Sequence, residues 1–381
     1  MLIKYPSTNS IMNLNVFRNI SLIIERDSKS TTYKFALLRG VIDIIQEYSP
    51  YIKVKQERVH FPLGLLVEKW LIYYYPILES KVKIPQINSG RSYLAFEKSF
   101  NSIIDFYKTK GGFSVFYNDL TSKGIPNEIH EDFIKLCREL RQTITGMPMK
   151  YIGRSISEDF YSIFMYNNHR FSPKGKEIDL LFLINNLGEF SIPRDYFDSF
   201  KIIGSFINGQ DSIIFKWAEF SVNASGQRLS VQQVIKEVLR TPVTTREVNE
   251  SKILYKNILK EEGQVYCVWT GSKTSRYDID HMIPFSIWKN NDLWNLLPTK
   301  SSVNISKSNK IPSPLLIEKQ KDLILEYWNI SNKYFPKRFQ KEIEIALLGN
   351  PSNAWADIGI KQLKYNCEHL INNRGFEEWK I

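Results

Sequence analysis

Five residues in the C-terminal half of the chain have types and spacing that could do chemistry. Asp280 stands directly before His281, Asn295 and Asn304 lie 14 and 23 residues after that histidine, and Lys307 follows one helical turn later. A histidine with an ordinary pKa of about 6.5 is neutral at cellular pH and can accept a proton. Carboxylate and carboxamide oxygens are hard ligands that suit Mg²⁺ or Mn²⁺. Such groups could together activate a water and stabilise charge on a phosphate, as phosphodiester hydrolysis requires.

The segment around these residues resembles the HNH (ββα-metal) endonuclease motif in its Asp-His…Asn…Asn form. Pro284 follows the Asp-His pair, and a Tyr-Cys-x-x-Thr-Gly sequence at residues 266–271 resembles the opening of the first hairpin in that superfamily. Each element is weak alone, but their shared order and intervals are specific. The resemblance spans about 50 of the 381 residues. It implies a metal-dependent nuclease built on two short strands and a helix.

The resemblance also implies a role for each residue. His281 would be the general base, and Asp280 and Asn304 would hold one Mg²⁺ or Mn²⁺ ion. Asn295 would be structural, its side chain clasping the loop between the two strands and fixing the imidazole. Lys307 would contact the phosphate or the transition state.

One departure from the superfamily concerns zinc. Many members hold a structural zinc with two Cys-x-x-Cys pairs, but here Thr270 stands where Cys267 would have its partner. Since no cysteine pair follows Asn304, a four-thiolate site is unavailable and no structural zinc is expected. Packing must then hold the unit together. We expect a small core with these members: Val265, Trp269, Ile279, Ile283, Trp288, Leu293, Trp294 and Leu296.

Every one of these residues also has an ordinary interpretation. Asp280-His281 could be a surface turn, and Asn295 and Asn304 could be loop or cap residues, which asparagine favours. Lys307 taken alone is more readily a solvated side chain than a catalytic one, and the resemblance makes the two interpretations equal. The combined spacing favours the chemical interpretation.

The elements around the site indicate an α+β protein in four parts. Residues 1–150 read as a mainly helical domain, and residues 151–244 as an α+β region with a small, mainly antiparallel sheet that could serve in recognition. Residues 245–316 form the HNH unit, buttressed by helices near 245–260 and 316–330 because so short a unit is a poor independent core. A helical segment at 317–381 completes the chain.

Local patterns give the elements of the first two parts. Apolar residues at helical spacing predict helices after Thr32 and Pro62, and the second helix makes Tyr73-Tyr74-Tyr75 a core stripe more readily than a base-stacking one. Four apolar runs predict strands at residues 177–185, 188–193, 201–207 and 211–220, with a hairpin turn at Asn208-Gly209. The mixed aromatic and basic stretch at 154–176 is either a nucleic-acid surface or an ordinary strand and loop.

The composition of the chain indicates the kind of partner and the cellular compartment to expect. The net charge is +11 and the pI about 9.2, which favours a polyanionic partner such as nucleic acid. Three widely spaced cysteines form no disulfide framework and suit a reducing cytoplasm. The N-terminus lacks a signal-peptide apolar region, and the most apolar stretch, at 61–78, is too short and too charged to span a bilayer.

These observations lead to one leading hypothesis and two alternatives. The first is a cytoplasmic DNA endonuclease of restriction or phage-defence type that acts on double-stranded DNA, as a homodimer or with partner proteins of a defence operon. A homing endonuclease or nickase would use the same centre. A catalytically inactive, nucleic-acid-binding HNH protein belongs to a different class, and the complete set of site residues argues against it.

Overall fold

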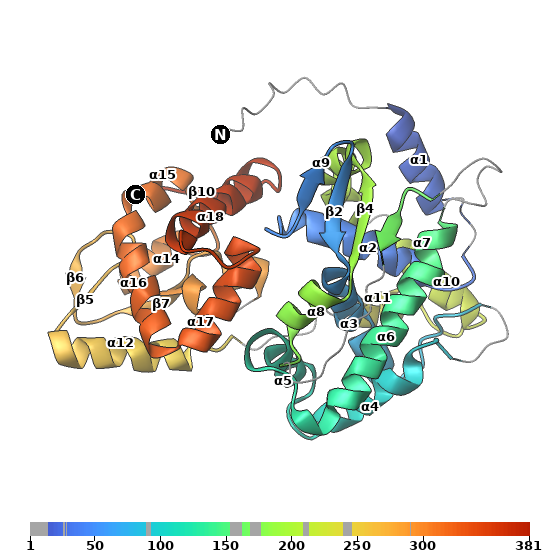
Figure 1. The fold of residues 1–381 in the computed structure, drawn as a ribbon, viewed down its shortest axis with the longest axis horizontal. Coiled ribbons are helices and arrows are strands. Elements are labelled where there is room, and N and C mark those ends of the chain that lie inside the picture. Colours follow the sequence, from blue (N-terminus) through green and yellow to red (C-terminus); the bar gives the residue numbers. More distant parts are fainter. Residues whose placement is uncertain are drawn as a thin grey trace.

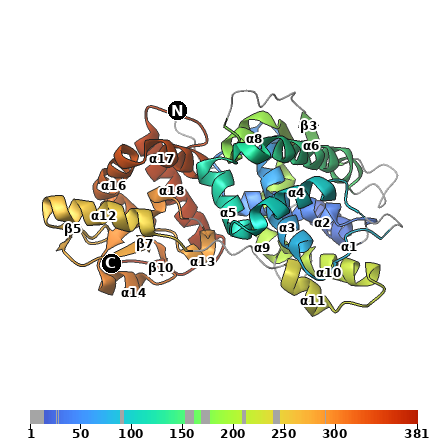
Figure 2. The same ribbon diagram turned by 90° about the horizontal axis from the view of Figure 1, so that it is seen from below.

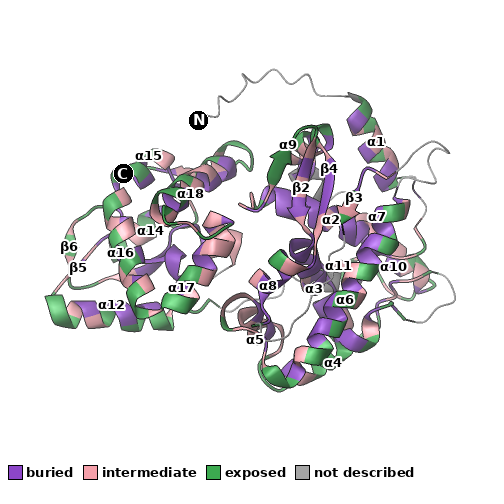
Figure 3. Cartoon of the chain, in the orientation of Figure 1, coloured by how far each residue is buried: buried purple, intermediate pink, exposed green. Residues whose placement is uncertain are grey.

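The computed structural model describes residues 14–25, 27, 29–88, 93–152, 162–167, 177–208, 213–238, 246–289 and 291–381. Figure 1 shows two lobes, one blue to green and the other yellow to red. Each lobe has its own cluster of buried hydrophobic residues, one running from Val16 to Val234 and the other from Leu254 to Trp379. Figure 3 shows these buried residues inside each lobe. None of the described helices is long and apolar enough to cross a membrane.

The first lobe is helical around one small sheet. Its strands are β1 (Lys53–Lys55), β2 (Arg58–Pro62), β3 (Met165–Asn167) and β4 (Glu189–Pro193), antiparallel in the order β1-β2-β4-β3. Its helices up to residue 151 are α1 (Leu14–Glu25), α2 (Tyr33–Gln46), α3 (Leu63–Glu79), α4 (Glu97–Lys108), α5 (Gly112–Asn118), η1 (Asp119–Lys123), η2 (Asn127–Ile129), α6 (His130–Gly146) and α7 (Pro148–Tyr151). The helices that follow are α8 (Leu180–Asn186), α9 (Arg194–Asn208), α10 (Ile213–Ala224) and α11 (Val231–Val238).

Helix α3 is the centre of this lobe. Its apolar stripe and the Tyr73-Tyr74-Tyr75 run are buried, which confirms that the tyrosines are core residues. Gly64 lets the helix start lie against α8, because a Cβ there would come within 2.2 Å of the Leu183 carbonyl carbon. The helix predicted after Thr32 is α2, although the Thr32 hydroxyl bonds the Tyr74 hydroxyl and does not cap the helix.

Three of the four predicted strands are wrong, and the fourth is confirmed as β4. Residues 177–185 mostly form α8, 201–207 lie in α9, and 211–220 overlap α10. A short apolar run fits a buried helix as well as a buried strand, so packing and capping decide. The Asp179 carboxylate caps α8 by accepting from the Phe182 amide at 2.7 Å. Helices flank the predicted hairpin turn, whose Gly209 lies outside the described residues.

Parts of two other predictions also fall outside the described residues. In the 154–176 stretch only residues 162–167 are described, and β3 lies there. The helix expected near 245–260 is α12 (Asn249–Glu262).

The second lobe surrounds the expected ββα unit with helices. Its elements up to residue 307 are α12, β5 (Val265–Tyr266), β6 (Lys273–Thr274), β7 (Asp278–His281), α13 (Phe285–Trp288), η3 (Leu293–Asn295), β8 (Leu296–Thr299) and α14 (Ser301–Lys307). Those that follow are β9 (Ile311–Pro312), α15 (Pro314–Lys319), α16 (Lys321–Tyr334), α17 (Pro336–Ile343), η4 (Glu344–Leu348), α18 (Trp355–Asn372) and β10 (Glu378–Trp379). The eight predicted core residues of the unit all pack in this lobe's cluster, joined by α12, α16 and α18.

The two clusters divide between α11 and α12, where the sequence suggested the boundary at residues 244 and 245. We propose that the four predicted parts are arranged in two domains, one on either side of that boundary. Polar contacts join the lobes: the Ser122 hydroxyl donates to Glu342 at 3.1 Å, and Lys341 pairs with Asp179 at 2.8 Å. In Figure 2, α5 and α13 lie on the sides of the two lobes that face one another.

Candidate active site

The site is built on the antiparallel pair β7 and β8, with α14 following β8. The register places Asp280 opposite Leu297 and His281 opposite Leu296. All four β8 residues are buried, so this strand forms the floor of the unit. Since successive strand residues point to opposite faces, Asp278 and Asp280 share one face and His281 takes the other.

Asn295 ties the chain after His281 to the start of β8. Its Oδ1 accepts from the Ile283 amide at 2.8 Å, and its Nδ2 donates to the Ile283 carbonyl at 3.0 Å. Its backbone carbonyl accepts from the Met282 amide at 2.8 Å. The side chain is fully buried. These bonds set where the chain leaves β7 and so where the imidazole stands.

Asp280 is buried, and both of its carboxylate oxygens have partners. Trp269 Nε1 donates to Oδ2 at 2.7 Å, and Lys307 Nζ lies 3.0 Å from Oδ1. Burial raises the pKa of Asp280, while the Lys307 charge and the Trp269 and Lys307 hydrogen bonds act to lower it. Lys307 is itself fully buried and also donates to the His281 carbonyl at 2.7 Å. The interpretation of Lys307 as a solvated side chain is therefore wrong.

The His281 imidazole is enclosed and neutral. It is 2% exposed, and neither ring nitrogen has a hydrogen-bond partner within 3.5 Å among the described residues. Burial lowers the pKa of His281 to about 4; the charges of Arg246 and Lys307 lower it too, while the nearby Asn291 side chain opposes them. The Phe285 ring lies 5.3 Å away, centroid to centroid. A neutral ring whose unprotonated nitrogen has no hydrogen-bond partner can accept a proton.

Asn304 faces a groove on the surface of this lobe. Its Nδ2 donates to Asp278 Oδ2 at 3.3 Å. The groove has a volume of about 700 Å³, and we call it the basic groove. Its lining residues are Arg246, Val248, Lys252, Lys256, Tyr277, Asp278, Ile279 and Asn304.

The structure thus brings most of the predicted residues together. Asp280 contacts Lys307, His281 adjoins both, and Asn295 positions the loop that follows. Asn304 instead donates a hydrogen bond to Asp278, which lies two residues before Asp280 on the same face of β7. Sequence reasoning missed Asp278, which the two-residue period of β7 could have identified as a neighbour of Asp280. It also missed Arg246, which no motif interval indicates.

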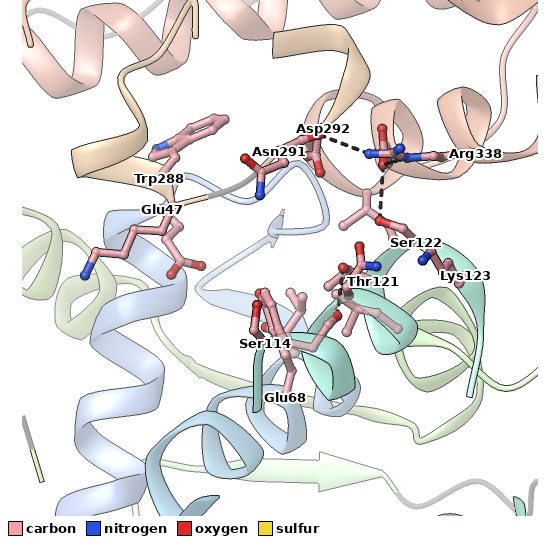
Figure 4. Close-up of a pocket in the computed structure, with 18 of the residues that line it drawn as sticks. Glu47, Glu68, Ser114, Thr121, Ser122, Lys123, Trp288, Asn291, Asp292 and Arg338 are labelled. Carbon is pink, nitrogen blue, oxygen red and sulfur yellow. Dashed lines mark hydrogen bonds and ion pairs between the residues drawn. The ribbon is translucent and has the colours of Figure 1, made fainter. Parts of the chain in front are cut away.

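A second cavity, of about 520 Å³, lies between the lobes. Figure 4 shows Glu47, Glu68 and Thr121 of the first lobe facing Trp288, Asp292 and Arg338 of the second. None of the candidate catalytic residues lines it. Asn291 lines this cavity and its side chain also acts on the pKa of His281; its carboxamide oxygen accepts from the Glu247 amide at 2.9 Å.

Comparisons with known families agree with this geometry. Residues 270–313, which contain β7, β8 and α14, match the family described as HNH endonuclease. Residues 13–238 match the family described as a domain of unknown function, DUF8808. No curated protein matches the chain. The chain has a nuclease domain of the HNH superfamily, and because the second match covers more than half of its 381 residues, the protein belongs to the DUF8808 family.

Proposed function

We propose that this protein is a metal-dependent DNA endonuclease in which His281 is the general base. The observation that carries the proposal is the joint placement of a neutral imidazole, a buried carboxylate and a groove-facing carboxamide on β7 and α14. His281 would take a proton from the attacking water at one of its free ring nitrogens. Asn295 would keep the imidazole in place through the Ile283 backbone.

The donor set fits a hard divalent ion. Asp280 and Asn304 would hold Mg²⁺ or Mn²⁺, and Asp278 offers a further carboxylate at the groove. No three His, Cys, Asp or Glu side chains gather as a metal site in the described part of the chain, and the Asn304 carboxamide would add a neutral oxygen ligand to the carboxylates. A bound ion supplies charge stabilisation on the phosphate and the leaving oxygen. Lys307 would leave Asp280 and become available to the phosphate.

The enclosed imidazole sets one further condition. At 2% exposure, His281 can meet a substrate only after neighbouring side chains shift. Arg246 is exposed, and its charge acts on both His281 and Asp280. An arriving phosphate would attract this guanidinium.

A plasmid-cleavage assay tests the proposal. Purified protein should cut supercoiled DNA with Mg²⁺ or Mn²⁺ but not with EDTA, and His281→Ala should reduce the rate by about 10²–10⁴-fold, the usual contribution of a general base. His60→Ala is the matched control, because His60 lies in β2 of the first lobe and bonds Glu189. Absence of cutting by folded protein with every metal, or equal cutting by His281→Ala, would contradict the proposal.

The product distinguishes the finer alternatives. One HNH centre cuts one strand at a time, so a restriction-type or phage-defence enzyme that makes double-strand breaks would act as a homodimer or with partner proteins. Nicked circles alone would favour a nickase, and cutting at one defined locus a homing endonuclease. Metal-independent binding without product would indicate an inactive HNH protein, and RNA substrates in the same assay test the preference for DNA. A cytoplasmic location belongs to the same proposal.

A further inference from the structure

Helix α12 lies between the two matched family segments and belongs to neither. It runs along the lower edge of the second lobe in Figure 1. Its buried face carries Leu254, Tyr255 and Ile258, which pack in the lobe's core. That packing fixes the opposite face toward solvent, and Figure 3 shows the helix divided between buried and exposed residues.

The solvent face of α12 carries a stripe of lysines. Lys252, Lys256 and Lys260 follow one another at four-residue intervals, so they lie on one side of the helix about 6 Å apart along its axis. All three side chains are exposed, and none makes an ion pair with another described residue. The stripe is therefore a row of free positive charges on a rigid element.

Three other lysines of the lobe are paired, whereas Lys333 and Lys337 are, like the stripe, exposed and without an ion pair among the described residues. Lys310 pairs with Glu377 at 2.7 Å, Lys321 with Asp357 at 2.7 Å and Lys364 with Glu318 at 2.6 Å. Charges paired in this way need no external partner. The α12 stripe is unpaired as well, and its position distinguishes it from Lys333 and Lys337, because Lys252 and Lys256 line the basic groove.

The stripe leads into the candidate active site. Lys252, Lys256 and Arg246 line the basic groove, and Asp278 and Asn304 line it too. Lys260 continues the stripe one turn farther out. A negatively charged chain lying on α12 would consequently run toward Asn304, where hydrolysis is proposed.

We propose that α12 and Arg246 form a phosphate-binding track that guides one nucleic-acid strand to Asn304. The inference rests on the proposed function, since it names the surface that holds the substrate. Lysines bind backbone phosphates as point charges and release condensed counterions, so the track contributes affinity without base specificity. The regular four-residue spacing on a helix suits a regularly charged polymer.

Charge reversal on α12 tests the track separately from cleavage. Lys252→Glu/Lys256→Glu should weaken binding of a fluorescent 30-base-pair duplex in EDTA by at least about tenfold, and should reduce the slope of log affinity against log salt by about 2. The matched control is Lys333→Glu/Lys337→Glu, two exposed lysines also spaced by four residues in this lobe but outside the groove. The control makes the same change in net charge and should retain the affinity and the salt slope.

Each result has one meaning. A selective loss in the α12 variant supports the track. Equal losses in both variants would show that net charge alone drives binding, and unchanged binding by the α12 variant would also overturn the track while wild-type cutting kept the proposed function intact. If the reversed variant does not fold, judged by circular dichroism, Lys252→Gln/Lys256→Gln replaces it. Failure of the wild-type protein to bind or cut would remove both proposals.

Discussion

At the scale of single residues, the candidate site holds its reactive groups inside protein. His281, Asp280, Lys307 and Asn295 are all buried, although all four side chains are polar or charged in water. Burial is tolerated for Asp280 and Lys307 because each satisfies the other, and for Asn295 because the Ile283 backbone meets its carboxamide. The imidazole is left without a hydrogen-bond partner among the described residues, and it remains neutral because burial and the charge of Arg246 lower its pKa.

The lowered pKa of His281 predicts how stability depends on pH. The folded value is about 4 and the ordinary unfolded value about 6.5, so between them the unfolded chain binds a proton that the folded chain does not. Stability from this group is therefore present above pH 6.5, falls as pH falls through this window, and stays lost below about 4. Urea unfolding in EDTA should show a loss of about 2 kcal/mol from His281 between pH 7 and 5.

Comparison with a variant isolates that contribution. His281→Gln should show a smaller loss than wild type over the same interval, because glutamine does not titrate. His369, whose pKa burial also lowers to about 4, remains in both proteins and cancels. Identical pH dependence in the two proteins would show that His281 is accessible and ordinarily basic.

At the scale of elements, neighbouring helices hold the short strands of the site in place. The strands β5, β6, β7 and β8 are two to four residues long, and such pieces do not persist alone. Tyr327 of α16 holds β5 directly: its hydroxyl donates to the Tyr266 carbonyl at 2.7 Å and accepts from the Tyr266 amide at 2.9 Å. Trp328 of α16 donates to the Trp294 carbonyl at 2.7 Å.

Tyr327→Phe tests this buttress. Removing one hydroxyl leaves both Tyr266 backbone groups without their partner, so the free energy of unfolding should fall by about 1–3 kcal/mol. Tyr334→Phe, at the exposed end of the same helix, is the matched control and should change stability by less than about 0.5 kcal/mol. Denaturant unfolding measures both. Equal effects would mean that α16 supports the strands by apolar packing alone.

At the scale of the whole molecule, one buried glutamate links the lobes to the site. Glu342 is 2% exposed; its Oε2 accepts from the Leu293 amide at 2.7 Å, and its Oε1 accepts from the Ser122 hydroxyl and from Arg338 Nε. Leu293 lies two residues before Asn295, and Ser122 belongs to the first lobe. Loss of this carboxylate would loosen both connections at once.

Glu342→Ala should lower the free energy of unfolding of the second lobe by about 2–4 kcal/mol, because it leaves the buried Leu293 amide unpaired and removes one of the two carboxylate partners of Arg338. Scanning calorimetry should then resolve two transitions, with the second lobe melting first. Gln340→Ala, an exposed change on the same helix, should leave the trace unchanged. A single transition at the wild-type midpoint would show that apolar contacts alone couple the lobes.

Local sequence patterns account for much of what the structure shows. The intervals around His281 predicted an HNH unit, and the family match supports it, since motif spacing follows from two short strands and a helix. The helical stripes of α2 and α3 and the core of the unit were also predictable, because burial of an apolar face imposes a period that can be read along the chain.

Long-range packing decided the rest. Whether the apolar runs at 177–185, 201–207 and 211–220 become strands or helices depends on the surfaces they meet, and a short run carries no period strong enough to choose. Three features of the site likewise depend on segments far apart in the chain. They are the ion pair of Lys307 with Asp280, the hydrogen bond of Asn304 to Asp278, and the position of Arg246 and α12 beside the groove. The spacing of residues along the chain determines which side chains can contact one another within a local motif. Contacts between distant segments depend instead on the free energy of the whole packed core.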